Sequence, residues 1–264
     1  MADLGSIVRR LRSLRGTGRW TGRCGQAGAT FVLAAGLAAG LPACQPVGSG
    51  AVMTASMYAD LEVVSVGDGV SRVRATLRLG NMLDSTFVDL QPGDSLSATS
   101  AALTQPLART VDLMGGFSYT GVFTGDDPGT PFEIAFTRTS DVSAPSSKTT
   151  LPVRVTHLAA ATGATSSRAK ALPITWDAVS GGADLIDATI EGPCVIGLLK
   201  LSQPDTGQLV VGPSDLKSLP DNPQASCPIQ ITIARKHAGT VDPAFGAGAF
   251  YGIQQSTISV TSIP

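Results

Sequence analysis

The stretch Ser71-Arg-Val-Arg-Ala-Thr-Leu-Arg-Leu79 alternates apolar and charged or hydroxyl side chains along its whole length. Successive side chains of a β-strand point to opposite faces, so one face would carry Val73, Ala75 and Leu77 and the other face the arginines. The preceding segment 58–64 alternates in the same way, and Val66-Gly-Asp-Gly-Val70 between the two has the composition of a hairpin turn. The pattern predicts an antiparallel hairpin with one buried face.

Similar short segments follow this hairpin along the chain, separated by turns rich in Gly, Pro and Asp. The predicted strands are 86–90, 95–99, 117–123, 131–137 and 149–156, then 171–176, 187–192, 198–202, 208–211, 228–236 and 252–262. Helical periodicity is scarce, so the sequence predicts an all-β class. We expect two consecutive immunoglobulin-like antiparallel β-sandwich domains, 53–157 and 158–264, with one larger sandwich as the alternative.

The N-terminal region has the layout of an export signal. Six arginines precede an apolar run, 27–41, which is shorter than the ~20 residues that span a bilayer as a helix. The run ends in Leu41-Pro-Ala-Cys44. This ending resembles the lipobox of bacterial lipoproteins, which implies that residues 1–43 are a signal peptide and that Cys44 is acylated. An ordinary cysteine after a cleaved signal is the alternative, and Arg9-Arg10 leaves a twin-arginine signal open.

The resemblance also implies a place for the protein. Acyl chains on Cys44 would hold it in the bacterial cell envelope, and Gln45 after the cysteine would direct it to the outer membrane of a Gram-negative host. The Gly-rich segment 44–52 is expected to be a tether. The remainder resembles uncharacterised immunoglobulin-like envelope proteins, an architecture that specifies no single function.

Charge argues against one class of partner. Residues 1–43 contain six of the 19 basic and one of the 20 acidic residues, which leaves 13 basic and 19 acidic residues and a net charge of about −6. Binding to nucleic acid depends on basic surfaces that neutralise phosphates. We therefore expect no nucleic-acid partner for the mature chain.

Cys194 and Cys227 are the two cysteines left after Cys24 in the signal and Cys44 at the lipid site. Exported proteins meet an oxidising compartment, so a disulfide is expected, and closing its loop would stabilise the fold by roughly 3–4 kcal/mol. A metal site is the alternative, but His157 and His237, the only histidines, are not at zinc-ligand spacing from these cysteines.

Residues for catalysis are few. The sequence has no Gly-x-Ser-x-Gly motif, and both histidines are expected on the surface without carboxylate partners in a pocket. Asp126-Asp127, and likewise Asp184 and Asp187, are predicted to lie in solvated turns rather than in a calcium site. We expect no catalytic residue, no metal site and no cofactor, and the sequence identifies no ligand-binding residue.

Aromatic residues are expected in the core. Phe117, Tyr119 and Phe123 share one strand face, Phe132 and Phe136 share another, and Trp176 ends the predicted strand 171–176. The segment 234–252 carries Phe245, Phe250 and Tyr251 in a Gly- and Ala-rich context, and we expect a long hairpin packed on its own domain, with a recognition loop as the alternative.

The expected function is that of a membrane-anchored envelope lipoprotein with a non-catalytic structural, adhesive or partner-binding role. Its partners would be the membrane and an envelope protein or glycan. The alternative is a carbohydrate-binding module or a carbohydrate-active enzyme.

Overall fold

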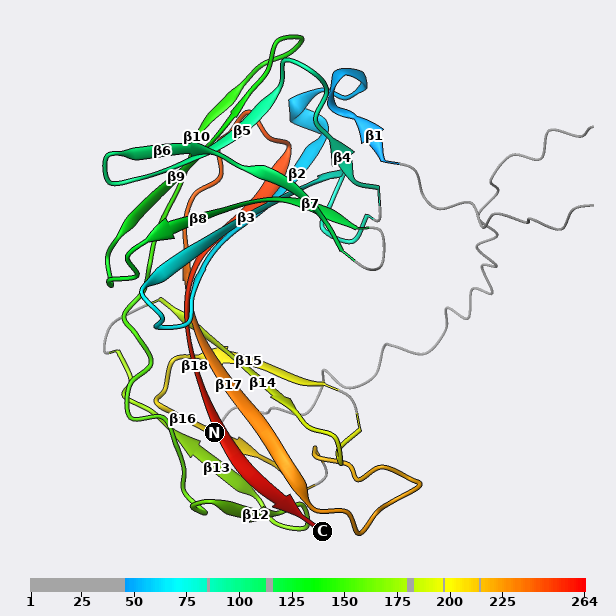
Figure 1. Ribbon diagram of the computed structural model, residues 1–264, viewed down its shortest axis with the longest axis vertical. Coiled ribbons are helices and arrows are strands. Elements are labelled where there is room, and N and C mark those ends of the chain that lie inside the picture. The colour runs from blue at the N-terminus through cyan, green and yellow to red at the C-terminus, as the bar shows by residue number, and fades with distance from the viewer. Residues whose placement is uncertain (1–45, 85, 113–115, 180–182, 197, 214) are drawn as a thin grey trace, which may run out of the picture. The chain divides into compact units, whose positions relative to one another are not determined.

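The computed structural model describes residues 46–84, 86–112, 116–179, 183–196, 198–213 and 215–264, whose regular secondary structure consists almost entirely of strands (Figure 1). The segment predicted to be a signal peptide, 1–43, and the residues Cys44 and Gln45 lie outside the described residues. The strands are β1 (Val47–Gly48), β2 (Met57–Ser65), β3 (Val70–Leu79), β4 (Val88–Asp89), β5 (Ser95–Ser100), β6 (Leu103–Pro106), β7 (Ala108–Val111), β8 (Phe117–Thr124), β9 (Pro131–Thr137), β10 (Ala144–Thr150), β11 (Ala159–Ala160), β12 (Thr165–Ser167), β13 (Leu172–Thr175), β14 (Leu185–Glu191), β15 (Leu199–Pro204), β16 (Gln208–Val211), β17 (Cys227–Ala238) and β18 (Ala247–Ile263). Two 3-10 helices, η1 (Ser49–Ala51) and η2 (Thr54–Ser56), lie between β1 and β2.

A nine-stranded sheet is shared by two sandwiches. Its order is β15-β14-β17-β18-β2-β3-β8-β7, with β12 paired to β18. Neighbours in this sheet are antiparallel except for β18 with β2 and β12 with β18, which are parallel. The four-stranded sheet β10-β9-β5-β6 and the three-stranded sheet β11-β13-β16 are fully antiparallel. The predicted all-β class built from antiparallel sandwiches is confirmed.

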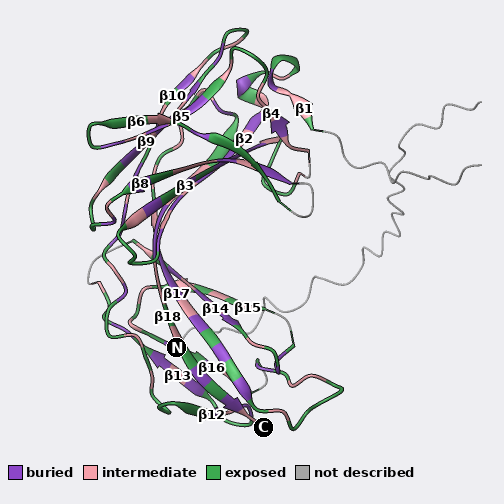
Figure 2. Cartoon of the chain, viewed as in Figure 1, coloured by how far each residue is buried: buried purple, intermediate pink, exposed green. Residues whose placement is uncertain are grey.

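The first sandwich packs β2, β3 and β8 against β5 and β9. Alternate residues of each strand enter its core, as the sequence pattern predicted, and Leu61, Val73 and Phe132 are each almost completely buried (Figure 2). The turn between β2 and β3 has Gly67 and Gly69 at φ +82° and +81°, values that glycine adopts without steric cost. The hairpin predicted over 58–79 is therefore present.

The second sandwich packs β14 and β17 against β13 and β16. Its core contains Ile174, Ile186, Val211 and Ile231, all at most 1% exposed. These positions alternate with exposed ones along their strands, which explains why the same period-2 pattern marked them in the sequence.

The hairpin of β17 and β18 belongs to both sandwiches (Figure 1). The two strands pair over twelve residues each, and residues 247–254 of β18 also pair with β2. Phe250 of β18 is part of the first core, whereas Val260 is part of the second. The expected boundary at 157/158 thus leaves one segment misplaced, because the first half of β18 and the residues just before it pack in the first sandwich.

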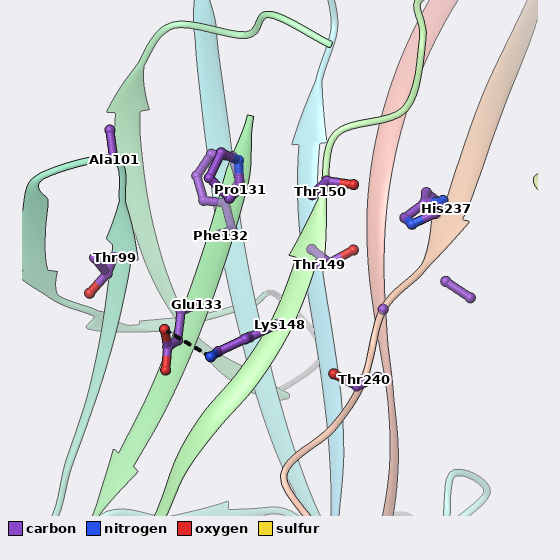
Figure 3. Close-up of a pocket in the computed structure, with 12 residues that line it drawn as sticks. Thr99, Ala101, Pro131, Phe132, Glu133, Lys148, Thr149, Thr150, His237 and Thr240 are labelled. Atoms are coloured by element: carbon purple, nitrogen blue, oxygen red, sulfur yellow. Dashed lines mark ion pairs between the residues drawn. The ribbon is translucent and has the colours of Figure 1, made fainter. Parts of the chain in front are cut away.

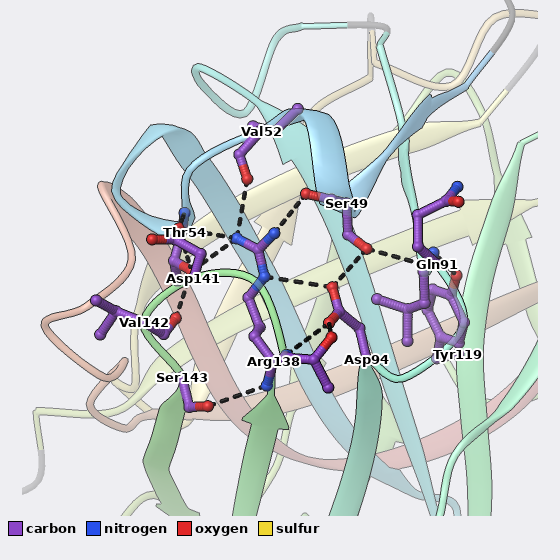
Figure 4. A network of polar contacts seen from close by, with 12 residues as sticks. Ser49, Val52, Thr54, Gln91, Asp94, Tyr119, Arg138, Asp141, Val142 and Ser143 are labelled. Atoms are coloured by element: carbon purple, nitrogen blue, oxygen red, sulfur yellow. Dashed lines mark hydrogen bonds and ion pairs between the residues drawn. The ribbon is translucent and has the colours of Figure 1, made fainter.

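The segment predicted to be a tether is largely folded (Figure 4). The buried guanidinium of Arg138 donates hydrogen bonds to the carbonyl oxygens of Ser49 and Val52 and to Thr54 Oγ1, and forms ion pairs with Asp94 at 3.3 Å and Asp141 at 3.0 Å. Burying a cation requires such a shell of acceptors. The tether expectation is therefore wrong from Val47 onward.

A second buried arginine lies where the two sandwiches meet. Arg235 of β17 is 0% exposed and pairs with Asp205 at 2.7 Å. It also donates to the carbonyl oxygens of Val153 and Arg154, both at 2.9 Å, and of Asp177 at 2.7 Å. One side chain thus joins β17, the strand-to-strand connection 151–158 and the loop after β15.

Several strands differ from the predicted ones, and the short strands β1, β11 and β12 were not predicted. The strand expected at 149–156 is β10, which starts earlier, at Ala144, and ends at Thr150. Apolar residues after Thr150 suggested a strand, but Leu151 packs in the first core and Val155 in the second, so this stretch is a connection. The short edge strands β6 and β7 were not predicted, because their exposed positions give no apolar alternation.

Candidate functional site

A groove of about 540 Å³ lies beside the edge of β10 (Figure 3). It is lined by the ends of β5 and β9, by Lys148–Thr150 of β10, and by His237–Thr240 at the start of the β17–β18 connection. Hydroxyls line much of it, namely those of Thr99, Thr149, Thr150 and Thr240. Thr149 Oγ1 is buried and has no hydrogen-bond partner among the described atoms.

Backbone contacts fix the wall of this groove. Lys148 and Thr240 exchange two N–H···O bonds of 2.8 Å, so the connection after β17 continues the edge of β10. Gly239 permits this approach, because a Cβ there would lie 2.2 Å from the carbonyl oxygen of Lys148. The charged groups in the groove are weakly coupled, since Lys148 and Glu133 are 3.8 Å apart and more than 40% exposed.

Both histidines have carboxylate partners, which corrects the sequence expectation. His237 Nδ1 lies 2.9 Å from Asp184 Oδ1, and His157 Nδ1 lies 2.6 Å from Asp177 Oδ2. The antiparallel register of β14 with β17 places Leu185 opposite Lys236, which brings Asp184 beside His237. His157 is 85% exposed, as expected for a surface histidine, and His237 is 45% exposed in the groove wall.

The acidic turns also differ from the expectation of solvated carboxylates. Asp126 is 5% exposed and accepts hydrogen bonds from Ser65 Oγ, the Gly69 N–H and Arg154. Burial raises the pKa of Asp126, but these bonds and the charge of Arg154 together hold it below its ordinary value. Asp126, in the loop between β8 and β9, therefore stabilises the turn before β3, and its oxygens are occupied by protein donors.

The carboxylates of Asp184 and Asp187 also have protein partners. Asp184 pairs with His237, and Asp187 accepts from Ser202 Oγ at 2.7 Å and from Lys236 Nζ at 3.0 Å. Within the described residues, no group of three or more His, Cys, Asp or Glu side chains is arranged to hold a metal ion.

The aromatic residues lie where the sequence placed them. Phe117, Tyr119, Phe123 and Trp176 are at most 6% exposed, which confirms the prediction of core positions. Tyr119 donates a hydrogen bond of 2.6 Å to Asp89, and Trp176 Nε1 donates one of 2.8 Å to Asp205. Buried polar edges of aromatic rings usually find such partners.

The aromatic segment before β18 has a different role from the one expected. Phe245 and Phe250 are 7% and 1% exposed, and both belong to the first core, with Phe245 stacked on Phe136 at 5.9 Å between ring centroids. A hairpin is present as predicted, but its aromatic residues Phe245 and Phe250 pack in the first sandwich rather than in the second. Tyr251 is half-buried, and Lys236 Nζ lies 4.3 Å from its ring centroid.

The predicted disulfide is confirmed. Cys194 and Cys227 are bonded, with their Cα atoms 5.7 Å apart. The buried Arg168 approaches this bridge, its Nη1 3.5 Å from Cys194 Sγ, and its other bonds reach the carbonyl oxygens of Pro223 and Ala225. The bridge and Arg168 together fix the long connection between β16 and β17.

Sequence reasoning missed the buried arginines. The signal was present: Ile229, Ile231, Ile233 and Arg235 occupy one face of β17, so the alternation that marks the core continues into Arg235. A charged residue on an otherwise apolar strand face indicates a buried ion pair, although the sequence alone does not identify its partners.

Comparisons with known proteins give little further guidance. No protein-family model and no curated protein matches this chain. Similar solved structures include a cytokine receptor complex (11% identity, 74% of this chain and 94% of that one, TM-score 0.25), the FN1–FN3 domains of chicken CNTN1 (8%, 78% and 67%, TM-score 0.25) and domains A168–A170 of titin (9%, 78% and 60%, TM-score 0.23). We base no argument on similarities this weak. No helix in the described part of the chain is long and apolar enough to cross a membrane.

Proposed function

We propose that this protein is a lipid-anchored protein of the bacterial cell envelope, held in the outer membrane by acyl chains on Cys44, with a non-catalytic structural role. In that role the first sandwich lies next to the anchor and holds the second sandwich at a fixed position relative to it. The support from sequence is the basic segment, the apolar run and the ending Leu41-Pro-Ala-Cys44.

One structural observation carries the proposal. Ser49 is only five residues beyond Cys44, and it is already fixed by the Arg138 network. From there the β17–β18 hairpin and Arg235 continue the connection into the second sandwich. A protein that needed to search freely around its anchor would have a long flexible linker, which this arrangement does not provide.

The polar contacts in the groove also support a non-catalytic structural role. His237 is hydrogen-bonded to Asp184, and Lys148 and Glu133 in the groove form an exposed ion pair. A carbohydrate-binding module, which is the alternative, would need exposed aromatic rings. Trp176 and Tyr119 are instead in the cores, which favours the structural role.

The proposal is tested by complementing a strain that lacks the protein and measuring the detergent sensitivity of its envelope. Cys44→Ser should fail to restore the envelope, because the protein is no longer held at the membrane. A combined groove variant, Glu133→Gln with Lys148→Met and His237→Gln, should restore it like the wild type. If the groove variant folds and stays membrane-bound yet does not restore the envelope, the groove performs the function and the structural proposal fails.

A further inference from the structure

Four large apolar side chains are exposed on the first sandwich near the start of the described chain. Leu83 is 88% exposed, Met53 66%, Val142 65% and Met82 58%. Single exposed apolar residues are ordinary on protein surfaces, so these four matter only if they lie together. We call them the entry patch.

Hydrogen bonds bring their segments to one end of the sandwich. Thr54, next to Met53, donates to the carbonyl oxygen of Val142 at 2.5 Å (Figure 4). The loop that carries Met82 and Leu83 begins at Gly80, whose N–H donates to the carbonyl oxygen of Ser56 at 2.9 Å. The entry patch is thus built from the segment between β1 and β2, which carries Met53, and from two loops that contact this segment.

The same end is where the chain arrives from Cys44. Val47 donates a 2.9 Å hydrogen bond to Phe87, the residue four positions after Leu83, and β1 pairs with β4. Three residues of extended chain span at most about 11 Å, so the Cα of Cys44 lies within that distance of the Cα of Val47. An acylated Cys44 sits at the headgroup level of a bilayer, whose polar layer is roughly 5–7 Å thick on each side.

We propose that the entry patch rests in the lipid interface around the anchor, so that the protein contacts the bilayer through side chains as well as through acyl chains. This rests on the proposed lipidation of Cys44. Of the two carboxylates beside the patch, Asp141 is paired with the cation of Arg138, and Asp84 accepts a hydrogen bond from the Thr86 N–H. Apolar side chains that enter the interface add to the binding of a lipid chain and fix the orientation of the domain.

The test places an environment-sensitive dye on single cysteines of the full-length lipidated protein in vesicles, with and without nitroxide-bearing lipids. The variants are Met53→Cys and Leu83→Cys, with Val210→Cys as the control, because Val210 is 57% exposed but lies on β16 of the second sandwich. The native disulfide stays closed and an acylated Cys44 takes no dye. The mass of the N-terminal peptide is measured on the same samples.

We expect the dyes at positions 53 and 83 to shift to the blue and to lose emission in nitroxide lipid, while the dye at 210 does neither. If Cys44 is acylated and the dyes at 53 and 83 behave like the control, the entry patch is not in lipid, although the anchor stands. A blue shift without quenching places the patch against a protein and also overturns the inference. If Cys44 carries no acyl chain, the proposed anchor and the inference fail together.

Discussion

At the scale of single residues, the buried Arg138 and Arg235 each join segments that are far apart in the sequence. Arg138 and its partner Asp94 are 0% and 2% exposed, so removing the cation leaves a buried carboxylate without its counter-charge. Breaking a buried pair in this way costs about 3–5 kcal/mol. We expect Arg138→Leu to lower the free energy of unfolding by that amount in urea titrations and to expose residues 46–56 to proteases.

The matched control is Arg72→Ala, which removes an exposed pair with Asp68 and should leave both readouts close to wild type. If Arg138→Leu is as stable and as protease-resistant as Arg72→Ala, the described role of the Arg138 network is wrong.

The buried carboxylates also set the response to acid. Burial raises the pKa of Asp205, but hydrogen bonds from Trp176 and Arg235 and the charge of Arg235 lower it below the ordinary 3.8, and Asp94 is lowered by Thr139, Ser49 and Arg138 in the same way. A lowered pKa contributes stability that is present above the unfolded value and is lost as pH falls through the folded value. Unfolding free energy should therefore change little from pH 7 to about 5 and fall below about pH 4. Stability that rises between pH 4 and 3 would contradict these assignments.

At the scale of elements, the β17–β18 hairpin depends on close backbone packing. A Cβ at Gly252 would lie 2.0 Å from the carbonyl oxygen of Thr150, so even alanine requires β18 and the end of β10 to separate. We expect Gly252→Ala to destabilise the protein by about 1–3 kcal/mol in thermal or urea unfolding, in the range of overpacked cores. Gly50→Ala is the control, because its Cβ would meet only Gln91 at 3.6 Å. Equal stability of the two variants would contradict the close approach of β18 to the end of β10.

Elements also show how far the sequence predicts this fold. The strands with regular alternation, such as β2 and β3, were placed to within one or two residues because local period-2 burial decides them. The return of Phe250 to the first core was not predictable, since nothing local distinguishes the first half of β18 from its second half. The carboxylate partners of the histidines depend on strand register, and no single-sequence pattern encodes which residues face each other across strands.

At the scale of the whole molecule, the shared hairpin should make the two sandwiches unfold together. Trp176, the only tryptophan after residue 43, lies in the second core and reports on that sandwich, whereas circular dichroism reports on all strands. In a two-state transition the two probes coincide. We expect coincident urea curves for the mature protein. Two separated transitions would show that β17 and β18 do not couple the sandwiches.

The central claim is that this pair of sandwiches is held at a membrane by a lipid on the first residue of the mature protein, Cys44. Mass spectrometry of the N-terminal peptide of the protein purified from membranes tests it most directly. The account predicts a peptide that begins at Cys44 and carries a diacylglyceryl group. A peptide that begins elsewhere, or an unmodified Cys44, would contradict the claim.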